Sequence, residues 1–407
     1  MTHSRGGPVT SPRAARTAPT TRSARPDWRP QIFGPFSVEP EVRFGRIAAR
    51  SPLFNTTNSA GGDRVLIGSA AGADAAEVAV RGRGELLERM GNVLAGRATE
   101  AASALVATYA GLRRRGAPVL DPAAWSGPES REAHQLWVTA RSLLSDAEVL
   151  VPAGLAFLQH RPPAGCTAPV RAGSTGLAAH PDRSAAVGHA AWEILERDLL
   201  RRSWQAPTVH PPAVHPVLGE LTPPVRHVCE NLGLRATALI LPASGACTVA
   251  VCLHTPDHRE QTFGARCGPH SDRARLLDRA AHEALMVRWS MGTPAARRAR
   301  ERLVLTGTPV SAVDHALWTY HGGQDALAHW LPDEPRTPWP PQAERLTPVD
   351  PVRLLTELTA QDVLAIETTP AALRDEGSAI VRLIAPGTHP LPSTTHPSSG
   401  VPPHPFG

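Results

Sequence analysis

The chain has 407 residues, of which 42% are hydrophobic and only 4% aromatic, so it is long enough for one large or two ordinary globular domains with an aliphatic, helix-rich core. Its net charge is +5, and all 42 residues of the Lys+Arg count are arginines. The missing lysine excludes a Walker A phosphate loop and Schiff-base chemistry, although a GC-rich genome that favours arginine codons is a sufficient cause.

Composition also argues against several other classes of protein. The positive charge gathers in residues 1–30, where six arginines face Asp27, and no basic stripe with interleaved aromatics follows, so we predict no nucleic-acid partner. With neither an export signal nor a run of eighteen apolar residues, we predict no membrane span. The five cysteines include no CxxC pair and therefore indicate neither a disulfide framework nor a zinc knuckle. We expect a cytoplasmic protein.

Three regions follow one another along the chain. Residues 1–30 are predicted to be a disordered basic tail, 31–390 an α/β (α+β) catalytic domain, and 391–407 a Pro-rich extended tail. The predicted elements, in chain order, are strands over 42–47 and 65–67, a small-residue loop over 68–74, helices over 75–94, 98–115 and 131–147, a strand over 149–151, an irregular segment over 162–174, a helix over 184–204, a strand over 248–254, a helix over 272–290 capped by Asp272, and an αβ stretch over 352–386 with a strand at 379–384.

Two matching pentads are the clearest sign of chemistry: Glu85-Leu-Leu-Glu-Arg89 and Glu193-Ile-Leu-Glu-Arg197. In a helix, positions i, i+3 and i+4 share a face, so each pentad presents two carboxylates and one guanidinium together. Converging carboxylates repel one another unless cations lie between them, and Mg²⁺ prefers carboxylate oxygens. The alternative is that each pentad is an ordinary salt-bridged, solvated helix face. The pair of pentads predicts a metal–phosphate site.

The pentads and their surroundings resemble the YcaO family over residues 44–386. A glycine-containing segment at Gly72 precedes the first pentad, the loop 174–180 precedes the second, which extends as ExxERD to Asp198, and a third helix carries Glu283-Ala-Leu-Met-Val-Arg288. The resemblance implies a YcaO-like fold that binds ATP and Mg²⁺ between helices. Carried over by position, it implies catalytic roles for Glu193, Arg197 and Gly407, cofactor binding by Gly72, Glu85, Glu88, Arg89, His189, Glu196, Glu283 and Arg288, and metal binding by Glu85, Glu88, Glu193 and Glu196.

Four positions depart from the family pattern. Arg81 stands where many relatives have serine, His189 and Met286 where glutamine is usual, and Ala185 where some relatives have glutamate. These changes leave open a weakened or altered nucleotide site. His189 is one turn before Glu193, so it is either a phosphate or metal contact or a packed histidine.

The C-terminal residues 403–407 resemble the Pro-x-Pro-x-Pro tail of azoline-forming members, whose terminal carboxylate organises the active site, except that Gly407 replaces the last proline. A floppy Pro-rich end is the alternative. The resemblance implies ATP-dependent cyclodehydration of Cys, Ser or Thr in a ribosomally synthesised precursor peptide, with thioamide or amidine formation, or a non-catalytic peptide-binding subunit, as alternatives. The expected partners are the precursor and a separate leader-binding protein, E1-like or RRE-containing, because residues 1–30 are too polar to form such a domain; a homodimer is one option for assembly.

Overall fold

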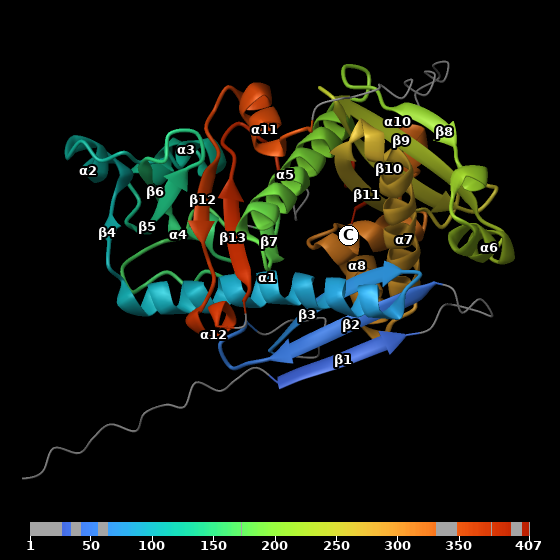
Figure 1. Cartoon of the computed structure of the whole chain (residues 1–407), viewed down its shortest axis with the longest axis horizontal. Helices are drawn as coiled ribbons and strands as arrows, with labels where there is room; N and C mark the ends of the chain where they lie inside the picture. Colours follow the sequence, from blue (N-terminus) through green and yellow to red (C-terminus); the bar gives the residue numbers. More distant parts are fainter. Residues whose placement is uncertain are drawn as a thin grey trace, which may run out of the picture.

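The computed structural model describes residues 27–33, 42–55, 64–171, 173–330, 348–375, 377–391 and 401–406. Three antiparallel sheets surround three long helices. Figure 1 shows α1 lying lengthwise over the first sheet, with the third sheet at the left, the second at the right and α5 running between them. This mixed architecture confirms the predicted α+β class.

The strands pair in three sets. The first sheet has the order β1-β2-β3, the second β11-β10-β9-β8, and the third β4-β5-β12-β13-β7 with β6 on β5. Their bounds are β1 (Asp27–Phe33), β2 (Arg43–Arg50), β3 (Val65–Gly72), β4 (Val106–Ala107), β5 (Gln135–Ser142), β6 (Glu148–Pro152), β7 (Leu177–His180), β8 (Ala213–Pro216), β9 (Arg235–Ala243), β10 (Ala246–His254), β11 (Thr262–Pro269), β12 (Leu364–Glu367) and β13 (Ala379–Ile384).

The helices include three that are much longer than the others, α1, α5 and α7. The bounds of the α-helices are α1 (Ala75–Ala102), α2 (Tyr109–Arg114), α3 (Ala123–Ser126), α4 (Ala153–Ala156), α5 (Arg183–Gln205), α6 (Pro223–Asn231), α7 (Arg273–Met291), α8 (Pro294–Thr306), α9 (Ala312–Tyr320), α10 (Ala326–Trp330), α11 (Pro351–Thr359) and α12 (Ala371–Arg374), and those of the 3₁₀ turns are η2 (Pro128–Arg131), η3 (Leu218–Glu220) and η4 (His270–Asp272). None of the described helices is long and apolar enough to cross a bilayer.

Each long helix packs on the strand that precedes it, which gives three strand–helix units: β3–α1, β7–α5 and β11–α7. Two strand glycines permit close packing. A Cβ on Gly68 would lie 2.0 Å from the carbonyl oxygen of Gly82, and one on Gly264 would lie 2.2 Å from that of Ala280. Because only glycine lets the backbones approach so closely, both helices are held directly against their strands.

Several predicted elements are confirmed, and three are wrong. The segment 68–74 is not a loop, since β3 continues to Gly72 beneath α1. The helix predicted over 98–115 is parts of two helices, because the residue that follows α1, Ser103, is in a left-handed conformation (φ 43°) and β4 separates α1 from α2. The helix predicted over 131–147 is replaced by β5, which is paired on one side with β6 and on the other with β12. Sheet pairing there overrides local helix propensity.

Smaller differences occur at the ends of elements. Strand β1 begins at Asp27, inside the segment predicted to be a tail. Asp272 precedes α7 but makes no capping hydrogen bond, because its carboxylate pairs with Arg275 instead. The predicted strand over 379–384 has the bounds of β13.

Residues 401–406 pack against the domain rather than extending into solvent. The side chain of Phe406 is only 3% exposed and lies against Phe263 of β11 and Trp330 of α10, with ring centroids 5.7 and 6.0 Å away. The indole nitrogen of Trp204 on α5 donates to the carbonyl of Pro402 at 2.8 Å. The described end of the chain is therefore docked, while residues 392–400 and Gly407 lie outside the described residues.

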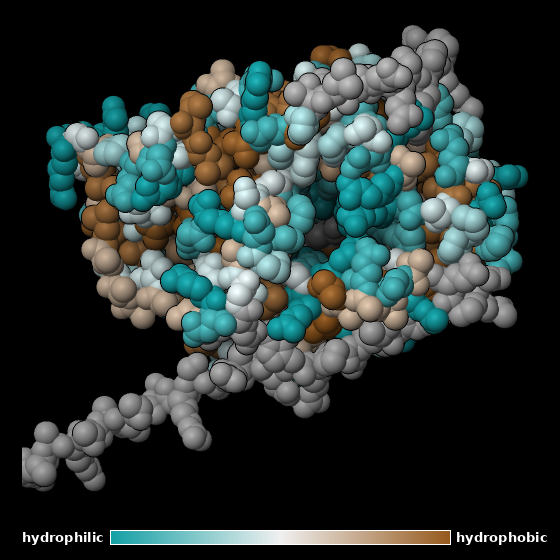
Figure 2. Space-filling model, in the orientation of Figure 1, coloured by the Kyte–Doolittle hydropathy of each residue, from teal (hydrophilic) through white to brown (hydrophobic). Residues whose placement is uncertain are grey.

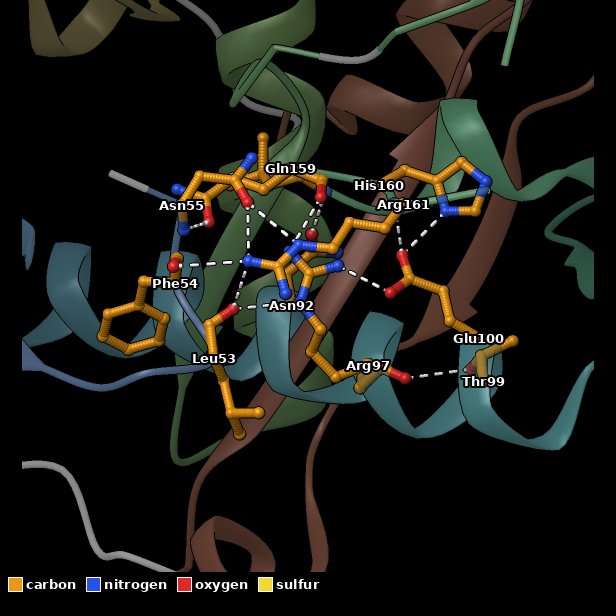
Figure 3. Close-up of polar contacts among 12 residues, drawn as sticks. Leu53, Phe54, Asn55, Asn92, Arg97, Thr99, Glu100, Gln159, His160 and Arg161 are labelled. Atoms are coloured by element: carbon orange, nitrogen blue, oxygen red, sulfur yellow. Dashed lines mark hydrogen bonds and ion pairs between the residues drawn. The ribbon is translucent and has the colours of Figure 1, made fainter. Parts of the chain in front are cut away.

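A buried polar network holds the C-terminal half of α1 (Figure 3). Glu100 accepts from Arg97 at 2.6 Å and from the backbone of Arg161 at 2.7 Å, and its other neighbour is His160 Nδ1 at 2.8 Å. The two arginines also donate to the carbonyl of Leu53. The network joins α1 to the segments on either side of it.

Candidate functional site

Each of the three long helices carries one glutamate that accepts a hydrogen bond from the backbone of its own strand–helix unit. The pairs are Glu85 with the N–H of Ser69 (2.5 Å), Glu193 with that of Gly176 (3.1 Å) and Glu283 with that of Ala265 (3.2 Å). We call these three residues the clamp glutamates. Ser69 and Ala265 each follow the glycine on which the helix packs, so the backbone fixes where these carboxylates lie.

The second glutamate of each pentad is free of such a clamp. Glu88 is half-buried and receives no hydrogen bond from any described residue, and Glu196 is 4% exposed with an ion pair only to its neighbour Arg197, at 3.4 Å. Burial raises the pKa of Glu88 well above its ordinary value, and Glu193 and Glu85 raise it further. Burial also raises the pKa of Glu196 to about 7, with Glu283 adding to the effect against Arg197. A bound cation would relieve both.

The arginines of the pentads face these carboxylates. Arg89 forms an ion pair with Glu85 at 2.5 Å and donates to the carbonyl of Ile67 at 2.7 Å. Burial on its own would lower the pKa of Arg89 and of Arg197, but the surrounding glutamates raise both. The two guanidiniums therefore stay charged inside the site, as anion binding requires.

Two further arginines complete the site and were missed from the sequence. Arg266 of β11 pairs with Glu283 at 2.5 Å, and Arg382 of β13 donates to the carbonyl of Gly173 at 2.8 Å. Arg382 is 6% exposed, and among the described residues its Nε has no partner. Burial lowers its pKa to about 10, and Glu193 opposes that shift. A single charge within the apolar strand Ala379–Ile384 was the signal available for it.

The arrangement suits a metal that is shared with phosphate. Within the described ranges, no three His, Cys, Asp or Glu side chains come together as a ligand set for one metal ion. Mg²⁺ is usually held by one or two carboxylates plus phosphate oxygens and water, so Glu88 and Glu196 are sufficient donors. Glu85 and Glu193, predicted as metal ligands, are engaged by backbone N–H groups. Figure 2 shows the surface hollowed at the centre of this face, between α5 and the β11–α7 unit of Figure 1.

Other predicted residues lie around the glutamates or apart from them. Arg288 pairs with Glu260 and stacks over the ring of Tyr320 at 5.4 Å, so its described contacts do not include the pentads. Gly72 ends β3, where a Cβ would lie 3.7 Å from Arg81 Nη1. Gly407 lies outside the described residues.

The structure also shows the surroundings of the other residues that depart from the family pattern. His189 is exposed, with its ring centroid 5.4 Å from that of His180 in an edge-on arrangement. Met286 packs against the hydrophobic core of the second sheet, and Ala185 is in the first turn of α5, where its N–H donates to Asp182. Asp198, next to the second pentad, is fully buried, and its carboxylate accepts a hydrogen bond from the backbone N–H of His389.

The sequence of the domain identifies its family. Residues 68–389 match the family described as YcaO cyclodehydratase, ATP- and Mg²⁺-binding. The chain belongs to the YcaO family. The cofactors of this YcaO protein are ATP and Mg²⁺, as predicted, and family membership supports an ATP-dependent enzyme.

Solved structures share the YcaO fold at low sequence identity. The YcaO protein of Methanopyrus kandleri, bound with AMPPCP and Mg²⁺, has a TM-score of 0.57 and 20% identity over 88% of this chain and 85% of its own. A heterocyclase in complex with substrate and cofactor has a TM-score of 0.60 and 18% identity over 86% of this chain. The matched part is about half (48%) of that protein. The E. coli microcin synthetase McbBCD complex has a TM-score of 0.55 and 13% identity over 91% of this chain and 93% of the matched chain. At these identities the similarity shows the fold alone.

A sequence relative matches over a short stretch. An uncharacterised protein of Methanothermobacter thermautotrophicus is 40% identical over 62 residues, which is 15% of this chain and 16% of that protein. This match adds no functional information.

Proposed function

We propose that this YcaO chain is an ATP-dependent cyclodehydratase that converts Cys, Ser or Thr of a ribosomally synthesised precursor peptide to azolines. The observation that carries the proposal is the pair of carboxylates, Glu88 and Glu196, which lie among charged arginines, accept no backbone hydrogen bond from the described residues, and have their pKa values raised by burial. In the reaction, the substrate side chain attacks the preceding amide carbon, the amide oxygen accepts a phosphoryl group, and loss of phosphate leaves the azoline.

The residues of the chain position the reactants and balance charge. ATP with Mg²⁺, when bound, supplies the phosphoryl group that the amide oxygen accepts. Glu88 and Glu196 would hold the Mg²⁺, and Arg197 would contact phosphate oxygens through its planar guanidinium fork. Arg89, whose two terminal nitrogens bind Glu85 and the carbonyl of Ile67, would add its positive charge to the site. Glu193 orients α5 through its bond to Gly176, so its catalytic contribution is positioning.

The docked C-terminus supports a role for the last residue. Phe406, the last residue that the structure describes, is buried. His404 stacks on His315 of α9 with centroids 4.1 Å apart, and Gln324 donates to the carbonyl of Pro403 at 2.5 Å. Contacts at successive residues are expected of a tail with a fixed position, and the proposal assigns Gly407 the organising role of the azoline-forming members.

The proposed partners are the precursor peptide and a separate leader-binding protein of the E1-like or RRE-containing kind, acting in the cytoplasm. The structures with a similar fold support this: one is a heterocyclase with substrate, and another is a synthetase assembled from several proteins.

Mass spectrometry tests the proposal. A Cys/Ser/Thr-rich precursor encoded beside the gene for this chain is incubated with the chain, the leader-binding protein and ATP. We expect each modified residue to lose the mass of one water, only when ATP is present. Replacement of oxygen by sulfur at the same backbone would instead establish thioamide formation. Absence of both ATP hydrolysis and mass change would favour a non-catalytic subunit.

A further inference from the structure

The loop that precedes β7 is held at both ends by side chains of opposite charge. At its first residue, Arg382 of β13 donates from Nη1 to the carbonyl of Gly173 at 2.8 Å. At its last residue, Glu193 of α5 accepts from the N–H of Gly176 at 3.1 Å. We call residues 173–176 the braced loop, because a strand and a helix together fix where its backbone lies.

The braced loop borders open space. Gly173 is exposed, and its φ is outside the left-handed region. Apart from its chain neighbours, no described residue has an atom within 4 Å of a Cβ built on Gly173. The two middle residues, Ser174 and Thr175, are half-buried and carry hydroxyl groups. A polar ligand therefore finds both room and hydrogen-bonding groups beside this loop.

Arg382 lies against the braced loop with hydrogen-bonding capacity left over. It is only 6% exposed, and its Nε has no partner among the described residues. The hydrogen bond to Gly173 joins it to a neutral carbonyl rather than to a carboxylate. A guanidinium has five N–H donors, and a buried donor without an acceptor is costly to the fold. Such a donor is expected where a ligand supplies the acceptor.

The surroundings of Arg382 differ from those of the other arginines of the site. Glutamates raise the pKa values of Arg89, Arg197 and Arg266 against the effect of burial. Burial lowers the pKa of Arg382 to about 10, and the charge of Glu193 opposes only part of that shift. This cation therefore lacks a full counter-charge, which an oxygen that gains negative charge would supply.

We propose that Arg382 and the braced loop bind the substrate amide that the enzyme activates, with the guanidinium donating to the carbonyl oxygen of that amide. The inference rests on the proposed function. The amide oxygen gains negative charge when the substrate side chain attacks the amide carbon, and it keeps this charge until the phosphoryl group bonds to it. Because the hydrogen bond is strongest while the oxygen is charged, Arg382 acts as a catalytic residue. The open space at Gly173 receives the adjoining peptide backbone.

Kinetics of azoline formation test the contact of Arg382 with the amide, using the chain, the precursor, the leader-binding protein and ATP. Arg382→Lys keeps the positive charge but loses the planar fork of donors. It should lower kcat by about 10- to 100-fold and change the KM for the precursor by less than about threefold. Calorimetry with MgATP should give the Kd of the natural chain, since the contact is with the peptide.

A second variant tests the open space without changing the guanidinium. Gly173→Ala adds a methyl group that meets no described atom, so the midpoint of urea denaturation should not change. The methyl group should crowd the bound peptide and raise the KM for the precursor by about five- to tenfold. The matched control is Gly219→Ala in η3, another exposed glycine with open surroundings, which should change neither the midpoint nor the KM.

The outcomes distinguish this inference from the proposed function. Absence of any product with the natural chain would refute both. Azoline formation with the natural kcat and KM in both Arg382→Lys and Gly173→Ala would refute the amide subsite alone. A weaker Kd for MgATP with an unchanged kcat in Arg382→Lys would assign this residue to the nucleotide and overturn the proposal. If Arg382→Lys does not fold, the KM of Gly173→Ala decides the matter.

Discussion

Two glutamates on the same helix, Glu88 and Glu100, differ in what surrounds them. Glu100 has three partners, Arg97, His160 and the backbone of Arg161 (Figure 3). Burial on its own would raise the pKa of Glu100, but these partners lower it below its ordinary value. Glu88, twelve residues earlier, has no described donor, and its pKa is raised.

This difference distinguishes carboxylates that stabilise the fold from carboxylates that are available to a ligand. A buried carboxylate whose oxygens are all engaged stabilises the fold and has no capacity left for a ligand. A carboxylate left without donors is costly to the fold, and such groups gather where a ligand or metal supplies the missing partner. Glu88 and Glu196 fit the second description and Glu100 fits the first, whereas the clamp glutamates Glu193 and Glu283 lie between them, with one carboxylate oxygen engaged in each.

The largest effect is expected at the unsatisfied carboxylates. Glu88→Gln and Glu196→Gln should each lower ATP turnover by about 100-fold or more, because the side chain keeps its shape but no longer binds Mg²⁺ as an anion. The free energy of unfolding should stay the same or rise, since a desolvated charge is removed. ATP hydrolysis with precursor and partner, together with urea denaturation, measures both. A loss of stability that matches the loss of activity would contradict the comparison.

The converse is expected in the network of Figure 3. Glu100→Gln should lower the free energy of unfolding by about 2–4 kcal/mol, because it leaves Arg97 enclosed without its counter-charge. The Kd for MgATP should change less than about twofold after correction for the folded fraction. Glu357→Gln on α11 is the control, with an expected change within about 0.5 kcal/mol. A stable Glu100→Gln variant with impaired ATP binding would reverse the assignments.

The sequence predicted the helices that carry the pentads better than the surrounding fold. Helical spacing was enough to place both pentads on helices, because α1 and α5 have strong local patterns and Asp74 and Asp182 cap their first turns. The same local reasoning failed for β5, whose strand form depends on pairing with β6 and β12 from elsewhere in the chain. The sequence of a single segment does not show which distant strands it will pair with.

Within the candidate site, the sequence indicated which residue types take part, but not which glutamate binds the backbone and which is left without such a bond. Glu85 and Glu88 look alike in the sequence, and only the packing of β3 against α1 shows that the first binds a backbone N–H. Arg266 and Arg382 reach the site from strands distant in sequence, so spacing gave no indication of them. The close approach of α1 to β3 depends on Gly68, which the sequence pattern did not single out.

The smallest expected effect is a difference in how stability depends on pH. Folding raises the pKa of Glu196 from 4.5 to about 7, so between these pH values the folded state binds more protons than the unfolded state, and stability falls as pH rises through this window, by about 2–3 kcal/mol. Folding lowers the pKa of Glu100, so its contribution to stability is present at neutral pH and is lost as pH falls through the lowered pKa.

Urea denaturation at pH 5 and pH 8 measures the contributions of Glu196 and Glu100 separately. Glu196→Gln should be more stable than the natural chain at pH 8 and equal to it at pH 5, while the deficit of Glu100→Gln should narrow only in stronger acid. A pH-independent gain for Glu196→Gln would show that its carboxylate is already compensated and would remove it from the unsatisfied pair.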